Sequence, residues 1–259
     1  MLCQEIIDII EKSYPEKYAL DWDNVGLLAG RDDKEVERVY IALDATDEVV
    51  EAAVEQGANM LITHHPLILG ALKQVTNRNF IGRRIIKMLQ NDISYYAMHT
   101  NYDVLGMADL SGKMLHLHDA KVLEVTWDVG CQEGIGRVAD LEEAITLAEC
   151  ATAVKDSFHT GPVKVFGDLS CKVKRIAISP GAGKSMIGAA LGKKADVLVT
   201  GDIDHHTGID AVAEGLCIID AGHYGVEHIF VQDMKRYLEE NAPGIEVAAA
   251  PIRHPFVII

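Results

Sequence analysis

Short apolar runs alternate with amphipathic segments along most of the chain. The N-terminal segment LCQEIIDIIEKSYP has apolar residues at helical spacing, and further helices are predicted at residues 47–56, 80–90 and 104–117. Between them, RVYIALDAT, NMLIT and ISYYAM are apolar runs of the kind that form buried parallel strands. This order of elements predicts an α/β fold with a parallel sheet.

Two segments depart from this alternation. Residues 20–30, LDWDNVGLLAG, contain too many Asp, Asn and Gly residues for the interior of a helix or strand, so we expect a structured loop. In residues 122–168, glycines separate short strands around GIGRVAD, and LEEAITLAEC at residues 141–150 is predicted to be helical.

The order of elements in the first half recurs in the second. Each half has three predicted strands that end in polar residues: YIALDAT, NMLITHHPL and ISYYAMHTNYD, then KRIAISPGAGKS, KADVLVTGDIDHH and LCIIDAGHYGVE. We infer a degenerate βαβαβ repeat that forms two interlinked α/β units, with their ligand-bearing strand ends facing a shared cleft. The predicted first unit comprises residues 1–121 with 222–259, and the second comprises residues 122–221.

Composition narrows the possible partners. The chain has 39 acidic and 24 basic residues among 259, and its formal net charge of −15 argues against a broad nucleic-acid-binding surface. One local basic cluster has helical spacing, which is more typical of a solvated helix face. Its members are Arg78, Arg83, Arg84 and Lys87.

Cysteine usage and the absence of long apolar runs indicate a cytoplasmic protein. The five cysteines are odd in number and have no CxxC spacing, which argues against a disulfide framework and against a thiolate zinc site. The N-terminus lacks the features of a signal peptide, and no apolar run approaches the ~20 residues needed to cross a bilayer. We therefore expect no membrane association.

The adjacent histidines His64 and His65 in ITHHPL are the first candidates for chemistry. They follow a predicted strand, and Pro66 prevents a simple helical continuation. Ligands of open α/β sheets bind at the carboxyl ends of the strands. Two solvated loop histidines would give the same pattern, so the interpretation depends on the other strand ends.

Two other strand ends carry possible ligands. HTNYD places His99 and Asp103 after the third strand, and DAGHYGVE places His223 and Glu227 four residues apart, at the start of a helix predicted over residues 224–240. Residues at this spacing share a helix face, although a solvated first turn is the simpler alternative. Imidazole and carboxylate together form a common coordination shell for zinc, iron, manganese or nickel.

We therefore predict a dinuclear centre that binds two divalent ions of unspecified identity. Its predicted ligands are His64, His65, Asp103, His223 and Glu227. A metal pair lowers the pKa of bound water and clamps the reacting atoms, which suits hydrolysis. His99 and His206 are the predicted catalytic acid–base residues, and His205 is a candidate for orienting ligands or contacting substrate. The remaining histidines, His116, His118, His159 and His254, are expected to be ordinary surface residues.

The segment SPGAGKS resembles a phosphate-binding loop but departs from the pattern. Ile178 stands where the loop requires a glycine, five residues before Gly183, so a P-loop nucleotide hydrolase is not supported. Its backbone N–H groups could still cradle an anion, with Lys184 reaching toward it.

Five motifs in order along the whole chain resemble those of the NIF-three-like family, also named the GTP cyclohydrolase 1 type 2 family. They are WDNVGLLAG, ITHHPL, HTNYD, GDIDHH and DAGHYGVE. The resemblance implies a two-domain α/β subunit, a dinuclear metal site and assembly into a hexameric ring. It carries the family's metal ligands onto the same five residues. The short link between the units lacks the inserted domain of longer members.

Two functions are compatible with these expectations. The first is a metal-dependent hydrolase that opens the imidazole ring of GTP or a related nucleotide, as the family name implies. The second is a metal-binding ring scaffold without turnover, which stores or delivers metal or encircles a nucleic acid. A phosphoesterase using the same metal pair is chemically reasonable, but no residue pattern of its own points to it.

Overall fold

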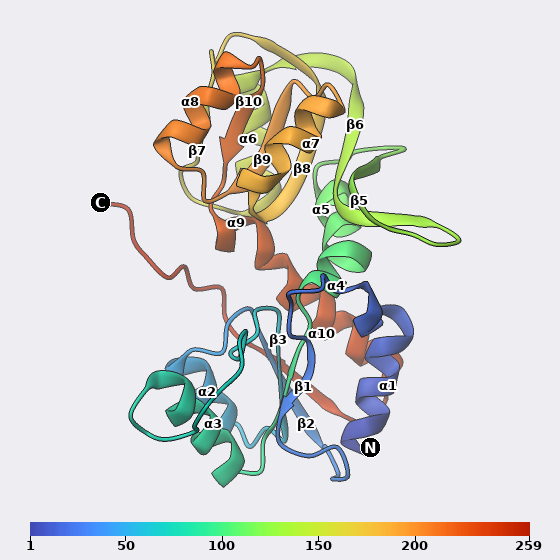
Figure 1. The fold of residues 1–259 in the computed structure, drawn as a ribbon, viewed down its shortest axis with the longest axis vertical. Coiled ribbons are helices and arrows are strands. Elements are labelled where there is room, and N and C mark those ends of the chain that lie inside the picture. Colours follow the sequence, from blue (N-terminus) through green and yellow to red (C-terminus); the bar gives the residue numbers. More distant parts are fainter. The chain divides into compact units, whose positions relative to one another are not determined.

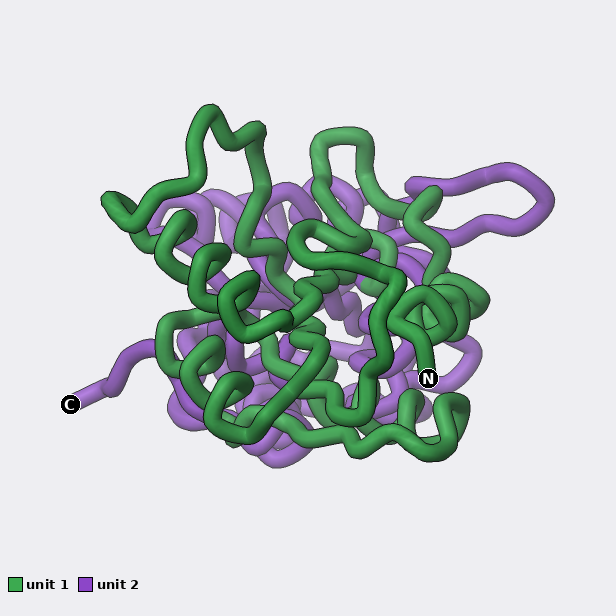
Figure 2. The backbone as a smooth tube through the Cα atoms, turned by 90° about the horizontal axis from the view of Figure 1, so that it is seen from below, with its two compact units in different colours: residues 1–102, 230–252 green, residues 103–229, 253–259 purple.

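A computed structural model describes the whole chain, residues 1–259, which forms two compact units (Figure 2). Unit 1 contains residues 1–102 and 230–252, and unit 2 contains residues 103–229 and 253–259. Each unit has one β-sheet with helices, which confirms the predicted α/β fold of two units. The ranges predicted from the sequence place the unit boundaries elsewhere, at 1–121 with 222–259 for the first unit and 122–221 for the second. They remain a prediction of where the functional domains divide.

The sheet of unit 1 has five strands in the order β1-β4-β3-β2-β11. β1 is antiparallel to β4, and the other neighbours are parallel. The strands are β1 (Gly26–Ala29), β2 (Arg38–Ala42), β3 (Met60–Thr63), β4 (Ser94–Ala97) and β11 (Glu246–Ala249). The helices are α1 (Cys3–Ser13), η1 (Glu16–Tyr18), α2 (Asp47–Glu55), α3 (Phe80–Gln90), α4 (Thr100–Tyr102) and α10 (Ile229–Asn241), whose first residue belongs to unit 2 (Figure 1).

The sheet of unit 2 has six strands in the order β5-β6-β8-β9-β10-β7. The strands are β5 (Lys121–Asp128), β6 (Gln132–Thr146), β7 (Lys164–Phe166), β8 (Lys172–Ala182), β9 (Val197–Gly201) and β10 (Cys217–Asp220). The helices are the π-helical turn η2 (Asp103–Met107), α5 (Ala108–Met114), α6 (Leu147–Phe158), η3 (Gly183–Met186), α7 (Ile187–Gly192), α8 (His205–Ala213) and α9 (His223–Glu227).

The predicted repeat is visible in both sheets. β2, β3 and β4 are parallel neighbours in chain order, and so are β8, β9 and β10. The middle strands β3 and β9 are buried along their whole length, as their continuous apolar sequences predict. In each unit, the carboxyl ends of three adjacent strands therefore meet at one edge of the sheet.

The loop predicted at residues 20–30 contains a strand, which corrects the prediction. Gly26–Ala29 forms β1 at the edge of the unit 1 sheet. Gly26 and Gly30 have φ angles of 94° and 99° at either end of this strand. A Cβ at Gly30 would lie 2.7 Å from the Ser94 Cα, so the glycine permits close approach of the two strands.

The helix predicted at residues 141–150 begins only at Leu147, because residues 141–146 extend β6. Thr146 pairs with Lys172 of β8 and also caps α6. The Thr146 side chain accepts a hydrogen bond from the Glu149 N–H, and the Glu149 carboxylate accepts one from the Thr146 N–H. This capping box fixes the start of the helix. The helix predicted over residues 224–240 is likewise divided, into α9 and α10, at His228.

All five cysteines are free thiols in the structure. None of the helices combines the length and apolarity that a bilayer-spanning segment requires.

Candidate metal centre

A buried tyrosine fixes the turn that carries the histidine pair. The Tyr95 hydroxyl, on β4, accepts a hydrogen bond from the Leu67 N–H (2.8 Å) and lies 3.1 Å from the His65 carbonyl oxygen. It also contacts the Thr63 hydroxyl at 2.8 Å. Burial raises the pKa of Tyr95 to about 12, so the phenol keeps its proton. The backbone around His64 is therefore held on both sides.

Three histidines of unit 1 come together at the ends of β3 and β4. One ring nitrogen each of His64, His65 and His99 lies within 4.8 Å of the others. In all three, Nδ1 is bonded to an oxygen atom, which favours the tautomer in which Nε2 carries the lone pair. The partners are the Met98 carbonyl for His64 (2.9 Å), Asp44 for His65 (2.8 Å) and Asp23 for His99 (2.9 Å).

Asp23 is the most constrained of these partners. Its side chain is fully buried and also accepts hydrogen bonds from the backbone N–H and the hydroxyl of Thr100. Burial alone would raise the pKa of Asp23, but the hydrogen bonds from His99 and Thr100 outweigh burial and lower it to about 2. Asp23 therefore stays ionised and keeps the His99 ring oriented.

Aromatic side chains surround His64. Its side chain is fully buried, and its ring centroid lies 5.2 Å from that of Phe230 and 6.1 Å from that of Tyr102. The two aromatic rings also contact each other, with centroids 5.0 Å apart. These contacts restrict the orientation of the His64 ring.

Unit 2 contributes the pair predicted from its spacing. His223 and Glu227 lie on α9, which follows β10, and His223 Nε2 is 2.9 Å from a Glu227 carboxylate oxygen. His223 Nδ1 is bonded to Asp202 at 2.9 Å, so it is held in the same manner as the unit 1 histidines. Glu227 is only 3% exposed. A buried carboxylate of this kind needs a cationic or hydrogen-bonding partner.

Glycines of the second unit make room for this pair. Gly181 has φ +81°, and a Cβ there would lie 2.5 Å from Glu227 Oε1. A Cβ at Gly201 would lie 2.4 Å from the His223 backbone nitrogen. The SPGAGKS turn therefore accommodates Glu227, and Lys184 pairs with Asp204 at 3.2 Å.

The remaining predicted residues are placed as follows. Asp103 begins the η2 turn of unit 2 and is partly exposed. His206 is exposed in the first turn of α8, with its ring centroid 5.1 Å from that of His205, and it shares no ligand group with the residues above. The structure brings His99 beside His64 and His65, in one group of side chains with the geometry to hold a metal ion.

Sequence reasoning missed the carboxylates that orient the rings. Asp44 and Asp202 follow β2 and β9, so their places after strands were a usable signal. Asp23 gave no such signal, because its partner His99 is 76 residues away in the sequence. Together these side chains offer nitrogen and oxygen donors without a thiolate, which fits zinc, iron, manganese or nickel.

Comparison with known proteins identifies the family of the chain. Residues 1–255 match the family described as Duf34/NIF3 (NGG1p interacting factor 3). The chain belongs to the Duf34/NIF3 family. The GTP cyclohydrolase 1 type 2 homolog of Clostridium perfringens (strain 13 / Type A) is 35% identical over 263 residues, covering 100% of both chains. The resemblance found in the sequence motifs is thereby confirmed.

Solved structures share the Duf34/NIF3 fold. A Bacillus cereus protein related to NIF3 superposes with a TM-score of 0.93 at 27% identity, covering 100% of this chain and 99% of that one. A Staphylococcus aureus hypothetical protein does so with a TM-score of 0.89 at 30% identity, again covering 100% and 99%.

Removing the Tyr95 hydroxyl should loosen the histidine turn. We expect Tyr95→Phe to weaken metal affinity by about tenfold, the lower end of the effect of losing an outer partner of a metal site. Competitive metal titration of the purified chain measures this. Tyr96→Phe is the matched control, because the Tyr96 hydroxyl is buried without a hydrogen-bond partner. Equal affinities for the two variants would contradict the assigned role.

Filling the space beside Glu227 should displace its carboxylate. We expect Gly181→Ala to reduce the bound metal per chain, measured by elemental analysis. Gly215→Ala is the control, because Gly215 has φ +91° but nothing within 4 Å of an added Cβ. Both variants should lose about 1–2 kcal/mol of stability from left-handed backbone strain. Only Gly181→Ala should lose metal. Equal metal content in the two variants would contradict the role of Glu227 as a metal ligand.

Proposed function

We propose that the ligand sets of the two units form one dinuclear metal centre, and that it hydrolyses GTP or a related purine nucleotide. The proposed ligands are His64, His65, Asp103, His223 and Glu227. The observation that carries the proposal is the common anchoring of the histidines, each of which has Nδ1 bonded to an oxygen atom. The names of curated relatives, GTP cyclohydrolase 1 type 2 homolog, support the choice of substrate class.

The path of the chain supports a shared centre. Tyr102 and Phe230 are the residues of unit 1 at two of its crossings to unit 2, and both pack on His64. Asp103 directly follows Tyr102, and Glu227 precedes Phe230 by three residues. At about 3.8 Å between consecutive Cα atoms, the Cα atoms of Asp103 and Glu227 lie within roughly 4 and 11 Å of the Cα atoms of residues that contact His64.

The side chains of the site have distinct roles in this proposal. Bound divalent cations would lower the pKa of water and polarise the reacting bond. His99, oriented by Asp23, accepts the proton of the attacking water through Nε2 and returns it to the ring nitrogen that leaves. His206 is the second proposed proton carrier. Addition of water at the carbon between the two imidazole nitrogens opens the ring, and hydrolysis of the resulting formamide releases formate.

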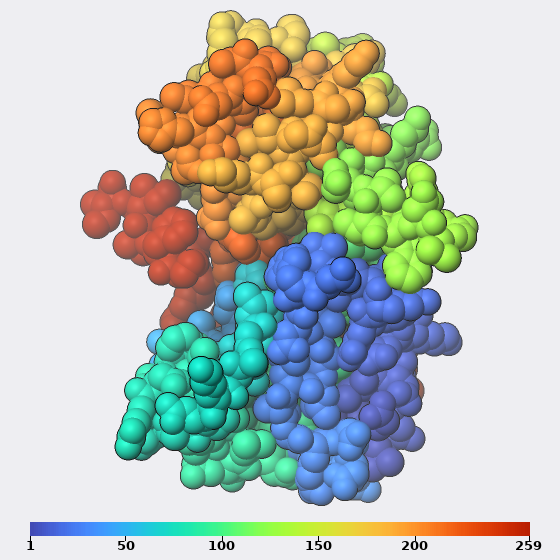
Figure 3. All heavy atoms as spheres, in the orientation of Figure 1, coloured from blue at the N-terminus to red at the C-terminus, as the bar shows by residue number.

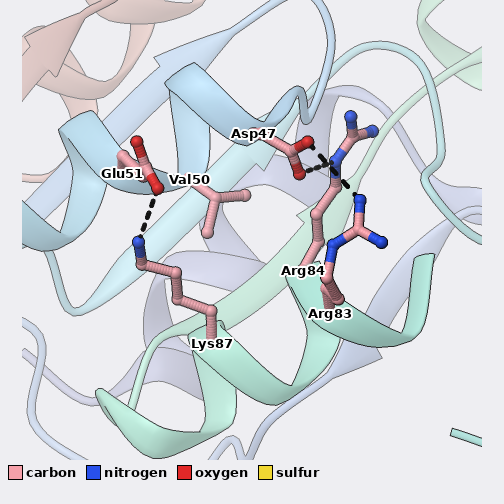
Figure 4. A pocket seen from close by; sticks show the side chains of 6 residues that line it. All are labelled: Asp47, Val50, Glu51, Arg83, Arg84 and Lys87. Carbon is pink, nitrogen blue, oxygen red and sulfur yellow. Dashed lines mark hydrogen bonds and ion pairs between the residues drawn. The ribbon is translucent and has the colours of Figure 1, made fainter. Parts of the chain in front are cut away.

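The alternative is a metal-binding ring scaffold without turnover. Its nucleic-acid form needs free basic side chains, but the basic residues of α3 pair with acids of α2 (Figure 4). Arg84 and Arg83 contact Asp47 at 2.8 and 3.9 Å, and Lys87 contacts Glu51 at 2.9 Å. This pairing weighs against nucleic-acid binding, and metal storage or delivery is the remaining form of the alternative.

Metal-loaded protein should release formate from GTP. We expect two metal ions per chain by elemental analysis, and formate release above that of a control containing the metal alone. His99→Gln should lower the rate by about 100-fold or more, because a positioned acid–base group contributes that much. His118→Gln, at an exposed histidine outside the site, should match the wild type. Stoichiometric metal without formate would leave the scaffold as the function.

We also propose that the chain assembles into a hexameric ring. Light scattering after size exclusion should then give a mass of about 170 kDa, six times the chain mass of 28.3 kDa. Oligonucleotides should not bind this assembly even at low salt, because the basic residues of α3 are paired and the net charge of the chain is negative. Salt-dependent oligonucleotide binding would instead support the nucleic-acid scaffold, and a monomeric mass would refute the ring.

A further inference from the structure

A cavity of about 620 Å³ lies in unit 2 beside the candidate ligand His223. This volume is within the range of about 300–1,000 Å³ that is usual for small-molecule sites. The two neighbours of His223 in the sequence, Gly222 and Tyr224, line it, and so does Asp202, which bonds the His223 ring. A ligand in this cavity would therefore adjoin the proposed metal centre.

Aromatic side chains form one wall of the cavity. The Tyr224 and His254 ring centroids are 5.1 Å apart, and those of His254 and Phe256 are 6.5 Å apart. The Arg253 N–H donates a hydrogen bond to the Tyr224 hydroxyl at 2.9 Å, which ties the C-terminal segment to α9. The C-terminal segment, red in Figure 3, is exposed. Phe256 is 58% accessible. The wall is therefore suited to a planar aromatic ligand that stacks on its rings.

The lining of the cavity also contains a carboxylate, Asp202, and an ammonium group, Lys164. Asp202 uses Oδ2 to accept from His223 Nδ1, which leaves Oδ1 as an acceptor. Lys164 Nζ lies 2.6 Å from Asp220 and 3.0 Å from the Ile203 carbonyl oxygen. An ammonium group has three donors, so Lys164 retains one for a ligand.

The carboxylate of Asp202 together with the ammonium group of Lys164 matches guanine better than adenine. Guanine presents two adjacent donors, N1–H and the exocyclic amino group, next to the O6 acceptor. A carboxylate can accept from the donors while an ammonium donates to O6. Adenine places an unprotonated N1 where guanine has N1–H, and that lone pair would face the carboxylate. An unmatched polar group in a binding site costs affinity.

We propose that this cavity binds the guanine base of the substrate. His254 and Phe256 stack on the base, and Asp202 reads its donor edge. The inference rests on the proposed function, because it identifies where the nucleotide base sits beside the metal centre. It also gives the C-terminal segment a role in substrate recognition and makes Asp202 the link between the base and His223.

Calorimetric titration of the full-length chain with guanosine and with adenosine tests the proposal. Guanosine should bind at least about tenfold more tightly than adenosine, in line with hydrogen-bond discrimination between related ligands. Phe256→Ala should weaken the binding of both nucleosides by about tenfold, because it removes a stacking partner. Asp202→Asn should weaken guanosine alone and abolish the preference. Leu169→Ala, at an exposed apolar residue of unit 2 outside the cavity, should behave as the wild type.

The outcomes separate this inference from the proposed function. No guanosine binding, equal binding of both nucleosides, or unchanged binding in Phe256→Ala and Asp202→Asn would each overturn the cavity assignment. Guanosine binding that depends on the cavity without formate release from GTP would support the assignment while removing the hydrolase. Formate release from GTP with an unchanged KM in Phe256→Ala and Asp202→Asn would support the hydrolase and overturn the cavity assignment. Circular dichroism spectra of the variants check that they fold.

Discussion

The candidate site depends on one interaction, the bond between an imidazole Nδ1 and an oxygen atom. Four histidines make it, with a backbone carbonyl in one case and a carboxylate in the other three. The bond removes the freedom of the ring to rotate or flip, and it favours the tautomer in which Nε2 carries a lone pair. Without it, the rings of two adjacent histidines would be mobile rather than held in one orientation.

The two sheets provide this interaction by the same arrangement. In unit 1, Asp44 follows β2 and holds His65, which follows the neighbouring strand β3. In unit 2, Asp202 follows β9 and holds His223, which follows the neighbouring strand β10. Adjacent parallel strands end side by side, so a carboxylate after one strand lies within reach of an imidazole after the next. The repeat therefore duplicates a carboxylate–imidazole pair as well as a fold.

Much of this arrangement could be predicted from the sequence, because continuous apolar runs mark buried strands and polar residues mark their ends. The histidine pair and His223 with Glu227 were selected as candidate ligands in this way. Asp23 was not, because its contact with His99 is made by tertiary packing. Local propensity also misassigned residues 141–146, where acidic and alanine residues favour a helix but pairing with β8 extends the strand.

The route of the chain through the two units has a consequence for synthesis. The strand β11 (Glu246–Ala249) completes the unit 1 sheet by pairing with β2, although the two are about two hundred positions apart in the chain. A ribosome releases β11 only after residues 103–229, nearly all of unit 2, have already emerged. The edge of β2 therefore remains unpaired in the nascent protein until β11 emerges. The sheet of unit 1, whose strands are synthesised first, is completed after the sheet of unit 2.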